Sequence, residues 1–271
     1  MSITAKILKR SSNPDDPYST ITSFQLRYPR FIHAELMTHR VFSRNASSSR
    51  AVPVNKIIDE VLSDPAMPSS WGKNQKGMQA SEDLNQEDVR QVKHMWLKSA
   101  QDAVFYARRM VELGAHKQIV NRILEPYSHI SVIVTATEWH NFFYLRCHPA
   151  ADPTMKALAD AMYGEYAHTK ATLRKHHLPY TDDSLLEGDV SSERLHQLKI
   201  QDAAMCARVS YLTHDGQKPS EESNTDLGKM LLDQKHMSPF EHQASVSHSG
   251  DRDTHLWGNF IGWNQFRKEL E

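Results

Sequence analysis

The residues between positions 87 and 113 have the pattern of one long amphipathic helix, and no other segment constrains the fold as strongly. Apolar residues recur there every three or four positions, and Gly114 follows, where a helix commonly ends. The apolar stripe consists of Val89, Val92, Trp96, Val104, Ala107, Met110 and Val111. This periodicity predicts a helix that buries one face.

Three segments have the alternation or the β-branched residues that favour strands. Residues 3–9 alternate and run into a turn-rich stretch at 11–17, and residues 20–28 alternate until Pro29. Residues 131–137 are rich in valine, isoleucine and threonine. A further strand is expected near 242–248.

The other periodic segments predict helices. The helix expected from Arg30 places Phe31, Ala34, Met37 and Val41 on one apolar face. Residues 63–82 contain prolines, serines and glycines and predict a long loop. Further helices are expected over 117–124, 138–146, 153–175, 192–211 and 225–235, with a stop at 176–179. The chain is therefore predicted to be a helix-rich α+β protein.

Composition excludes several classes of protein. The formal net charge of −1 argues against a protein that binds long nucleic acid through overall positive charge. No apolar run has the length of a membrane span, and no signal-like stretch opens the chain. Two cysteines provide no disulfide framework, which favours the cytoplasm. The sixteen histidines have no HExxH or CxxC spacing, so no metal site is expected.

The signature segment, residues 38–50, contains a histidine and an arginine, followed by two more arginines, an asparagine and a cluster of three serines at 47–49. Guanidinium groups and serine hydroxyls donate several hydrogen bonds in fixed directions, which suits phosphate oxygens and the carbonyl edge of a nucleobase. A solvated, serine-capped turn is the ordinary alternative. The order of residue types and the blocks elsewhere in the chain favour a binding role.

Three other blocks are open to two readings each when taken alone. Asn141 and Arg146 flank a short apolar helix, where the arginine either meets an anion or reaches solvent through its stem. Arg122, in the run 121–126, could simply balance a helix dipole. The runs 207–211 and 236–242 end the set, and Ser238–Glu241 within the latter is a plausible capping box.

Together the four blocks resemble the flavin-dependent thymidylate synthases. Arg40 and Ser48 have the spacing of that family's signature, and Arg50 follows it as expected. The other matches are Asn141 and Arg146 for a helix motif, Arg122 and Pro126 for a turn with one extra residue, and Ser210 with 236–242 for the last two blocks. The resemblance covers about residues 24–242 and implies a central, mostly antiparallel sheet in an α+β fold.

The order of the blocks departs from the family. The blocks at 207–211 and 236–242 usually precede the signature, whereas here they follow it. The chain is therefore expected to be one domain, residues 1–271, with circularly permuted order. Its C-terminal block, 200–271, would then correspond to the usual N-terminal part.

The resemblance implies a reaction: the methylation of dUMP to dTMP. Methylenetetrahydrofolate would supply the carbon and FAD would relay hydride from NADPH. Arg146 and Ser48 would be catalytic, and the implied dUMP contacts are Glu35, Ser48, Ser49, Arg50, Arg146 and, from another subunit, Arg122. The implied flavin contacts are His39, Arg40, Asn141, His236 and Ser238. A homotetramer with shared active sites is expected, with 87–113 at a contact.

Some family residues are replaced, which keeps other functions open. Thr38 and Ala46 stand where the signature usually has Arg and Glu, and Thr135 and Thr137 replace flavin-binding residues. Arg44 or Arg30 could compensate. The alternatives are transfer of a hydroxymethyl group, action on another pyrimidine nucleotide, or a flavin-free nucleotide- or nucleic-acid-binding protein.

Two further groups of residues invite a chemical role. Cys147 adjoins Arg146, but its helical position turns it away, so a small buried hydrophobe is the better interpretation. His248, Asp251, Asp253 and His255 resemble a metal cluster, yet they lie in a polar loop and are expected to be solvated.

Overall fold

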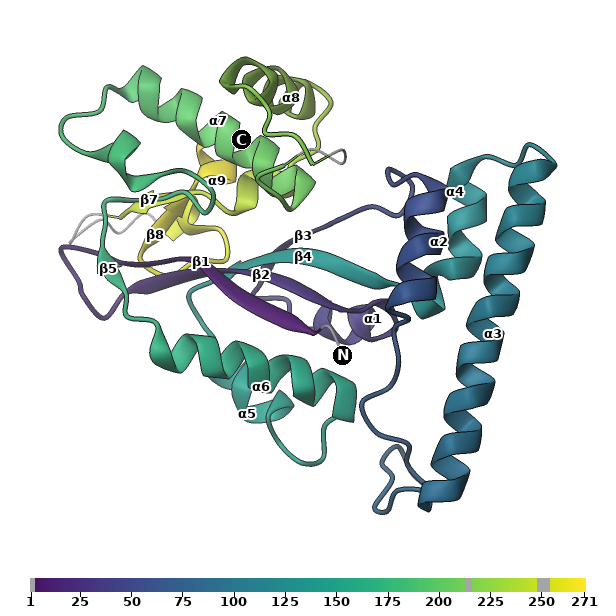
Figure 1. Ribbon diagram of the computed structural model, residues 1–271. Helices are drawn as coiled ribbons and strands as arrows, with labels where there is room; N and C mark the ends of the chain where they lie inside the picture. Colours follow the sequence, from purple (N-terminus) through teal and green to yellow (C-terminus); the bar gives the residue numbers. More distant parts are fainter. Residues whose placement is uncertain (1–2, 213–215, 248–253) are drawn as a thin grey trace.

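The computed structural model describes residues 3–212, 216–247 and 254–271. It is a mixed α+β fold in which helices surround a central sheet (Figure 1). The larger strands are β1 (Thr4–Ser12), β2 (Thr20–Pro29), β3 (Ser43–Ala46) and β4 (His129–Ala136), and the shorter ones are β5 (Thr172–Leu173), β6 (His176–His177), β7 (Ala244–Val246) and β8 (Trp263–Gln265). The α-helices are α1 (His33–Leu36), α2 (Val54–Ser63), α3 (Gln86–Glu112), α4 (Lys117–Val120), α5 (His140–Arg146), α6 (Pro153–His168), α7 (Ser192–Arg208), α8 (Glu221–Asp233) and α9 (Phe266–Leu270).

Five strands in the order β3-β4-β2-β1-β5 form the central sheet. Three of its four pairings are antiparallel, and the short β1–β5 pair is parallel. The strands β6, β7 and β8 form a second, smaller antiparallel sheet. The mostly antiparallel α+β fold expected from the resemblance is thus confirmed.

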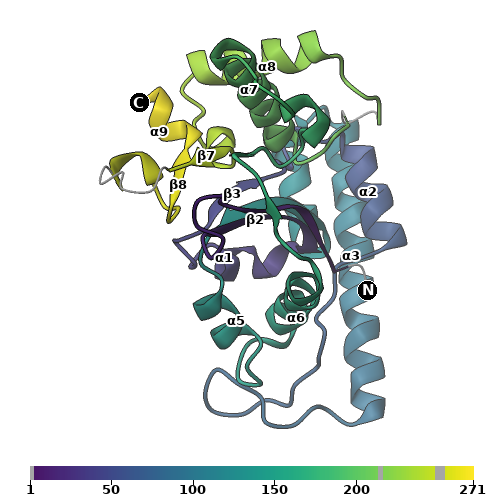
Figure 2. The same ribbon diagram turned by 90° about the vertical axis from the view of Figure 1, so that its left-hand side faces the viewer.

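One face of the central sheet is apolar. Phe24, Leu26 and Tyr28 of β2 alternate toward this face, where they pack with Val132 and Val134 of β4. Helices α5 and α6 cover it, as Figure 2 shows, and their Met155 and Leu158 side chains belong to the same buried cluster. This face therefore holds the main core.

The opposite face of the sheet is largely polar, and the last third of the chain covers it (Figures 1 and 2). Its buried hydroxyls need partners, because an unpaired buried polar group is costly. Ser23 Oγ lies 2.8 Å from His177 Nε2 and 2.6 Å from Thr135 Oγ1, and Thr135 Oγ1 lies 2.9 Å from His242 Nδ1. Two buried histidines thus join the C-terminal segment to the sheet.

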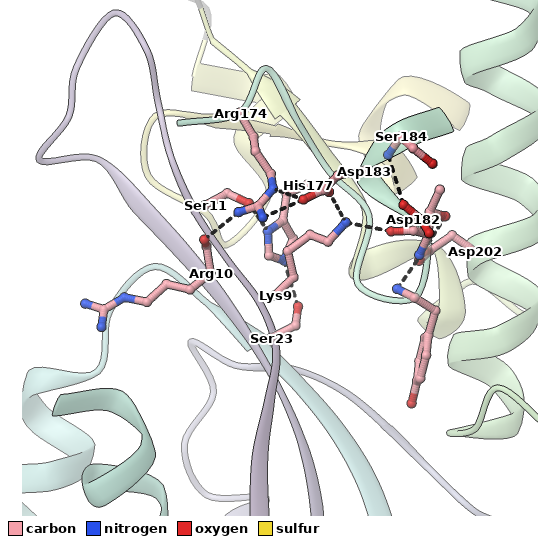
Figure 3. A network of polar contacts seen from close by, with 12 residues as sticks. Lys9, Arg10, Ser11, Ser23, Arg174, His177, Asp182, Asp183, Ser184 and Asp202 are labelled. Atoms are coloured by element: carbon pink, nitrogen blue, oxygen red, sulfur yellow. Dashed lines mark hydrogen bonds and ion pairs between the residues drawn. The ribbon is translucent and has the colours of Figure 1, made fainter. Parts of the chain in front are cut away.

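An ion-pair network at the edge of the same face is shown in Figure 3. Lys9 Nζ donates to the Thr181 carbonyl at 2.7 Å and to Asp183 Oδ1 at 2.6 Å, and Arg174 Nε donates to Asp183 Oδ2 at 2.8 Å. Burial alone would raise the pKa of Asp183, but the hydrogen bonds from Arg174 and Lys9 outweigh it and lower that pKa. The network holds the segment after β6 against β1.

Helices α2, α3 and α4 form a separate arm with its own core. Ile58 and Val61 of α2 pack against Val104 and Ala107 of α3 in this cluster. The far side of α3 exposes Phe105 and other large apolar side chains. The sequence prediction of this helix is confirmed, except that Val111 of its predicted apolar stripe is exposed, and Gly114 after it has a positive φ of 82°.

Three predicted elements differ from the structure. The segment after Pro29 is a 3₁₀ turn, Arg30–Ile32, followed by the four residues of α1. The face predicted to be buried is exposed at Phe31, Met37 and Val41, because Ile32, Leu36 and Phe42 turn inward instead. The segment has apolar residues on two faces, and the sequence pattern favoured the face that is exposed in the structure.

The second and third differences from the sequence prediction lie after α6 and after α8. Helix α6 ends at His168 instead of continuing to 175, and the expected stop at His176–His177 is strand β6, because these histidines pair with β7. Ser238–Glu241 is a 3₁₀ turn without a side-chain cap, so the capping-box interpretation is wrong. The loop at 63–82 and the strand near 242–248 are present, the latter as β7 within the described residues.

The contact between α7 and α8 predicts a sharp packing effect. A Cβ added to Gly228 of α8 would lie 2.5 Å from both the carbonyl oxygen and Cγ2 of Ile200 on α7. We expect Gly228→Ala to lower the free energy of unfolding by about 1–3 kcal/mol, because the backbone oxygen has no room to move. Urea unfolding measures the change.

The matched control is Gly164→Ala on α6, where an added Cβ meets nothing within 4 Å. This helix-interior change should raise the free energy of unfolding by about 0.5–1 kcal/mol. Equal effects of the two substitutions would contradict the described packing of α8 on α7.

Candidate functional site

Arg146, the last residue of α5, lies where α5 meets the start of the signature segment. Its Nε donates to His39 Nε2 at 2.9 Å and its Nη2 to Thr38 Oγ1 at 3.3 Å. Its Nη1 lies 3.6 Å from Glu35 Oε2. Two blocks about a hundred residues apart in the chain therefore converge on one guanidinium group.

His39 is neutral in this arrangement. Burial, followed by the nearby charges of Arg146 and Arg44, lowers its pKa to about 4. A neutral imidazole has one nitrogen without a proton, and Nε2 must be that nitrogen to accept from Arg146. The ring also contacts Phe42 and Phe142, which fix its plane.

Glu35 carries the opposing charge beside Arg146. Burial and the charge of Asp152 raise its pKa, and Arg146 partly offsets them. Thr38 donates its hydroxyl proton to the Glu35 carbonyl at 2.7 Å, so its oxygen is left to accept from Arg146. These contacts fix the guanidinium on one side.

Two cavities lie beside α5. The larger, of about 970 Å³, is lined mainly by aromatic residues together with His39, Asn141 and Thr137. The smaller, of about 480 Å³, is lined by Arg146. Tyr144 lines both, so the two cavities adjoin at that side chain.

The remaining signature residues are placed elsewhere in the single chain. Ser48, Arg40 and Arg50 are exposed. Ser49 is buried and donates its hydroxyl proton to Glu125 Oε1 at 2.7 Å. Arg122, which is exposed, donates to the same carboxylate oxygen at 3.1 Å, so a second polar cluster forms away from Arg146.

The C-terminal block contacts the signature segment through Asn45. Ser238 Oγ donates to Asn45 Oδ1 at 3.0 Å, and Asn45 Nδ2 donates to the carbonyls of Cys206 and Ala207 at 2.9 and 3.2 Å. His236 is exposed nearby in sequence. The last and first motif blocks of the chain therefore meet on β3.

The two threonines at flavin-binding positions of the family have different surroundings. Thr135 is fully buried and bonded to Ser23 and His242, so it is inaccessible to a ligand. Thr137 lines the larger cavity, and its hydroxyl accepts from the Ile261 amide at 3.1 Å. The Thr135 side chain is therefore part of the buried hydrogen-bond network that holds the fold together.

Neither cysteine is activated. Burial, together with a hydrogen bond to Asp160, raises the pKa of Cys147 to about 11, and burial raises that of Cys206. Cys147 is only partly buried, at the edge of the main core. Both thiols are free and protonated at neutral pH.

No group of three metal-ligating side chains gathers within residues 3–212, 216–247 and 254–271. His248, Asp251 and Asp253 lie outside the described residues, and His255 lies in the short turn Thr254–Trp257. In the same described ranges, no helix is long and apolar enough to cross a membrane.

Glu125 was missed as a site residue, and Arg44 was named only as a residue that could compensate for lost flavin contacts. Glu125 accepts from Ser49 and Arg122 and pairs with Arg30 at 3.2 Å. The spacing of three between Arg122 and Glu125 on a helical turn was the available signal. Arg44 donates to the His39 carbonyl at 2.9 Å, a backbone contact for which a sequence holds no signal.

The neutral state of His39 predicts how stability responds to pH. The unfolded chain binds a proton on this imidazole near the ordinary value of 6.5, whereas the folded chain binds it only near 4. The free energy of unfolding should therefore fall as pH drops from about 6.5 toward about 4. His39→Gln, which keeps an acceptor for Arg146 and does not titrate, should show a shallower fall in urea unfolding. Identical pH slopes would contradict a buried neutral His39.

Comparison with solved structures shows a related fold. Two structures of the UMP/dUMP methylase PolB from Streptomyces cacaoi, bound with 5-Br UMP and 5-Br dUMP, match with TM-scores of 0.50 and identities of 17% and 16%. Each match covers 61% of this chain, and 89% and 90% of theirs. Thymidylate Synthase X from Helicobacter pylori, solved with FAD and dUMP, matches with a TM-score of 0.37 and 15% identity over 54% of this chain and 67% of its own.

No curated protein sequence matches the chain. The family profile described as thymidylate synthase complementing protein matches residues 19–169, which include the signature segment, α5 and Arg146. The match spans more than half of the chain. The protein therefore belongs to the thymidylate synthase complementing protein family.

Proposed function

We propose that this protein methylates dUMP at C5 to give dTMP. Methylenetetrahydrofolate would supply the carbon and NADPH the hydride, with FAD as the resident cofactor. The observation that carries the proposal is the placement of Arg146 by His39, Thr38 and Glu35 in the lining of the smaller cavity, beside the larger cavity that His39 lines. Membership in the thymidylate synthase complementing family supports the same reaction class.

The larger cavity fits a flavin. Its volume of about 970 Å³ is at the upper end of ordinary ligand sites, and its aromatic lining suits a flat ring system. His39 and Asn141 line it directly, whereas Arg40, His236 and Ser238 would contact the cofactor from the exposed surface. A flavin bound there supplies hydride transfer.

Arg146 would hold the uracil ring. Methyl transfer to C5 requires negative charge to develop on the ring, and a guanidinium at the N3–C4=O edge stabilises that charge. His39 accepts the Nε proton and Thr38 accepts one proton of Nη2, so the remaining N–H groups of the two terminal nitrogens can bind the base. Because both thiols are protonated, this scheme uses no cysteine nucleophile.

The nucleotide's sugar and phosphate would be held by Ser48, Ser49 and Arg50, with Ser48 also catalytic and Glu35 near the base or ribose. In one chain Ser48 and Arg50 are exposed, and Arg122 lies on the Ser49 side. A site completed by neighbouring subunits would bring these groups to Arg146. We propose a homotetramer in the cytoplasm, with the exposed apolar face of α3, including Phe105 and Tyr106, at a subunit contact.

We also propose that the chain is one permuted domain. The bonds from Asn45 to Ser238 and to the Cys206 and Ala207 carbonyls support this, because they place the block 200–271 beside the signature segment. In the family, the block that corresponds to 200–271 usually precedes the signature segment in sequence. A permuted chain can keep the same site only if this block packs beside the signature segment in space.

Thr38 and Ala46 stand where the family signature usually has Arg and Glu. We therefore also consider two other reactions: hydroxymethyl transfer and action on another pyrimidine nucleotide. We expect incubation with dUMP, methylenetetrahydrofolate and NADPH to give a product heavier than dUMP by one methylene unit. Mass spectrometry of the nucleotide distinguishes this from a hydroxymethyl product. A colourless protein that FAD does not reconstitute, with no product, would instead favour a flavin-free nucleotide-binding protein.

A pair of neighbouring variants tests the catalytic assignment. Arg146→Ala should lower kcat by at least about 100-fold, because a preorganised charge at the ring is lost. Cys147→Ser, one position away, should keep most of the activity, because its thiol is protonated and serine conserves its size where it lines the larger cavity. Turnover assays measure both, and near-normal activity of the arginine variant would refute its role.

A further inference from the structure

Arg44 of β3 is the half-buried arginine of the signature segment, whereas Arg40 and Arg50 are exposed. It pairs with Val134 of β4, which belongs to the main core, so the Arg44 side chain leaves the sheet on its apolar face. A guanidinium on such a face is costly unless hydrogen-bond acceptors surround it. The position of Arg44 therefore depends on the partners it finds there.

These partners are two carbonyl groups of the turn that follows α1. Arg44 Nη1 donates to the Met37 carbonyl at 2.8 Å and to the His39 carbonyl at 2.9 Å. A terminal guanidinium nitrogen has one proton for each of these bonds, so the two carbonyls occupy Nη1 completely. The bonds lie on either side of Thr38 and link the turn to β3.

The hydrogen bonds of the turn's own backbone are local. Helix α1 ends at Leu36, and the Thr38 and His39 amides each bond a carbonyl three residues back at 3.2 Å. Such bonds shape the turn without connecting it to the sheet. The buried side chains of Leu36 and Phe42 hold it there by apolar contact, and Arg44 adds directed hydrogen bonds. Arg44 thus fixes the orientation of the turn as well as its place.

The turn carries the two side chains that accept from Arg146. Thr38 Oγ1 accepts from Arg146 Nη2 at 3.3 Å, and His39 Nε2 accepts from Arg146 Nε at 2.9 Å. A shift of the turn would therefore move both acceptors together. Arg44 itself lines neither cavity beside α5, so its effect on the site passes through the turn.

Arg44 also places a positive charge near the His39 ring. Burial, then the charges of Arg146 and Arg44, lower the pKa of His39 to about 4, which leaves a neutral ring that can accept from Arg146. The loss of either charge would make the imidazolium form easier to reach. That form has a proton on both nitrogens and cannot accept.

Other charged or titratable groups surround His39 on several sides. Glu35 of α1 faces Arg146 at 3.6 Å, and Arg40 follows His39 in sequence. The lining of the larger cavity adds Glu138, His140, Cys147 and four tyrosines. The two carboxylates favour a charged His39, and burial and the arginines outweigh them.

We propose that Arg44 is a positioning residue, which fixes the turn that carries Thr38 and His39 and keeps His39 able to accept from Arg146. Arg44 lies in the spacer of the signature, so it is not one of the residues that carry the family resemblance. Its part in turnover rests on the proposed methylation reaction. Its effect on the turn and on His39 does not, and can be measured in the protein alone.

An NMR titration of the histidine rings in the intact protein tests the effect on His39 without substrate or cofactor. The His39 signal is assigned by its absence in His39→Gln. We expect Arg44→Met, which lacks both charge and donors, to raise the midpoint of the His39 titration by at least about 0.5 pH unit, because a positive charge near the ring is lost. Arg44→Lys keeps the charge and should titrate as the wild type does.

Turnover assays on the same variants test the effect on Arg146. Arg44→Met should lower kcat for dUMP methylation by about 10–100-fold at neutral pH, because a displaced turn misplaces the guanidinium. On acidification its kcat should fall at a higher pH than that of the wild type, because His39 gains its proton earlier. Arg44→Lys can still donate to the turn carbonyls and should recover most of the activity.

The matched control is Lys229→Met, which removes one positive charge from an exposed position of α8 and should match the wild type in both measurements. Urea unfolding shows which variants remain folded, and Arg44→Gln replaces Arg44→Met if the latter does not fold. An unchanged His39 midpoint in the folded neutral variant, or equal losses of kcat in this variant and Arg44→Lys, would overturn the proposal. If the wild type does not methylate dUMP, the proposed function fails, and the His39 midpoints still decide whether Arg44 acts on this ring.

Discussion

The hydrogen bond from Arg146 Nε to His39 Nε2 is the contact on which the proposed chemistry depends. It exists only while His39 is neutral, and burial beside two arginines keeps it so. The bond aims a guanidinium that would otherwise search many rotamers, and such preorganisation is what makes a charge useful in catalysis. Thr38 and Glu35 restrict the same group from two other directions.

The fold supplies this contact by giving the sheet two different faces. The apolar face packs on α5 and α6, and this packing positions Arg146 at the end of α5 next to His39 of the signature segment. The polar face needs partners for its hydroxyls, and the C-terminal segment provides His177 and His242. Covering that face also brings Ser238 and the end of α7 to Asn45.

Local pattern predicted much of this architecture. The periodicity of α3, the alternation of β2 and the β-branched run of β4 each specify an element through neighbouring residues alone. The segment after Pro29 did not follow from pattern, because both of its faces are partly apolar and only tertiary packing buries Ile32 and Leu36. Local pattern predicts a stop at the histidines of β6, because their pairing partner, β7, lies almost seventy residues away.

The sequence predicted only part of the candidate site, because residue spacing along the chain does not record tertiary packing. Motif spacing pointed to His39 and Arg146, and the structure brings these two together. It leaves Ser48, Arg50 and Arg122 apart from them within one chain, because spacing says nothing of which subunit completes a site.

A crystal structure of the assembled protein with dUMP tests the central claim most directly. We expect an Arg146 terminal nitrogen to lie about 3 Å from a uracil carbonyl oxygen or from N3, with His39 still bonded to Nε. A uracil ring bound elsewhere, with Arg146 facing only His39, Thr38 and Glu35, would contradict it.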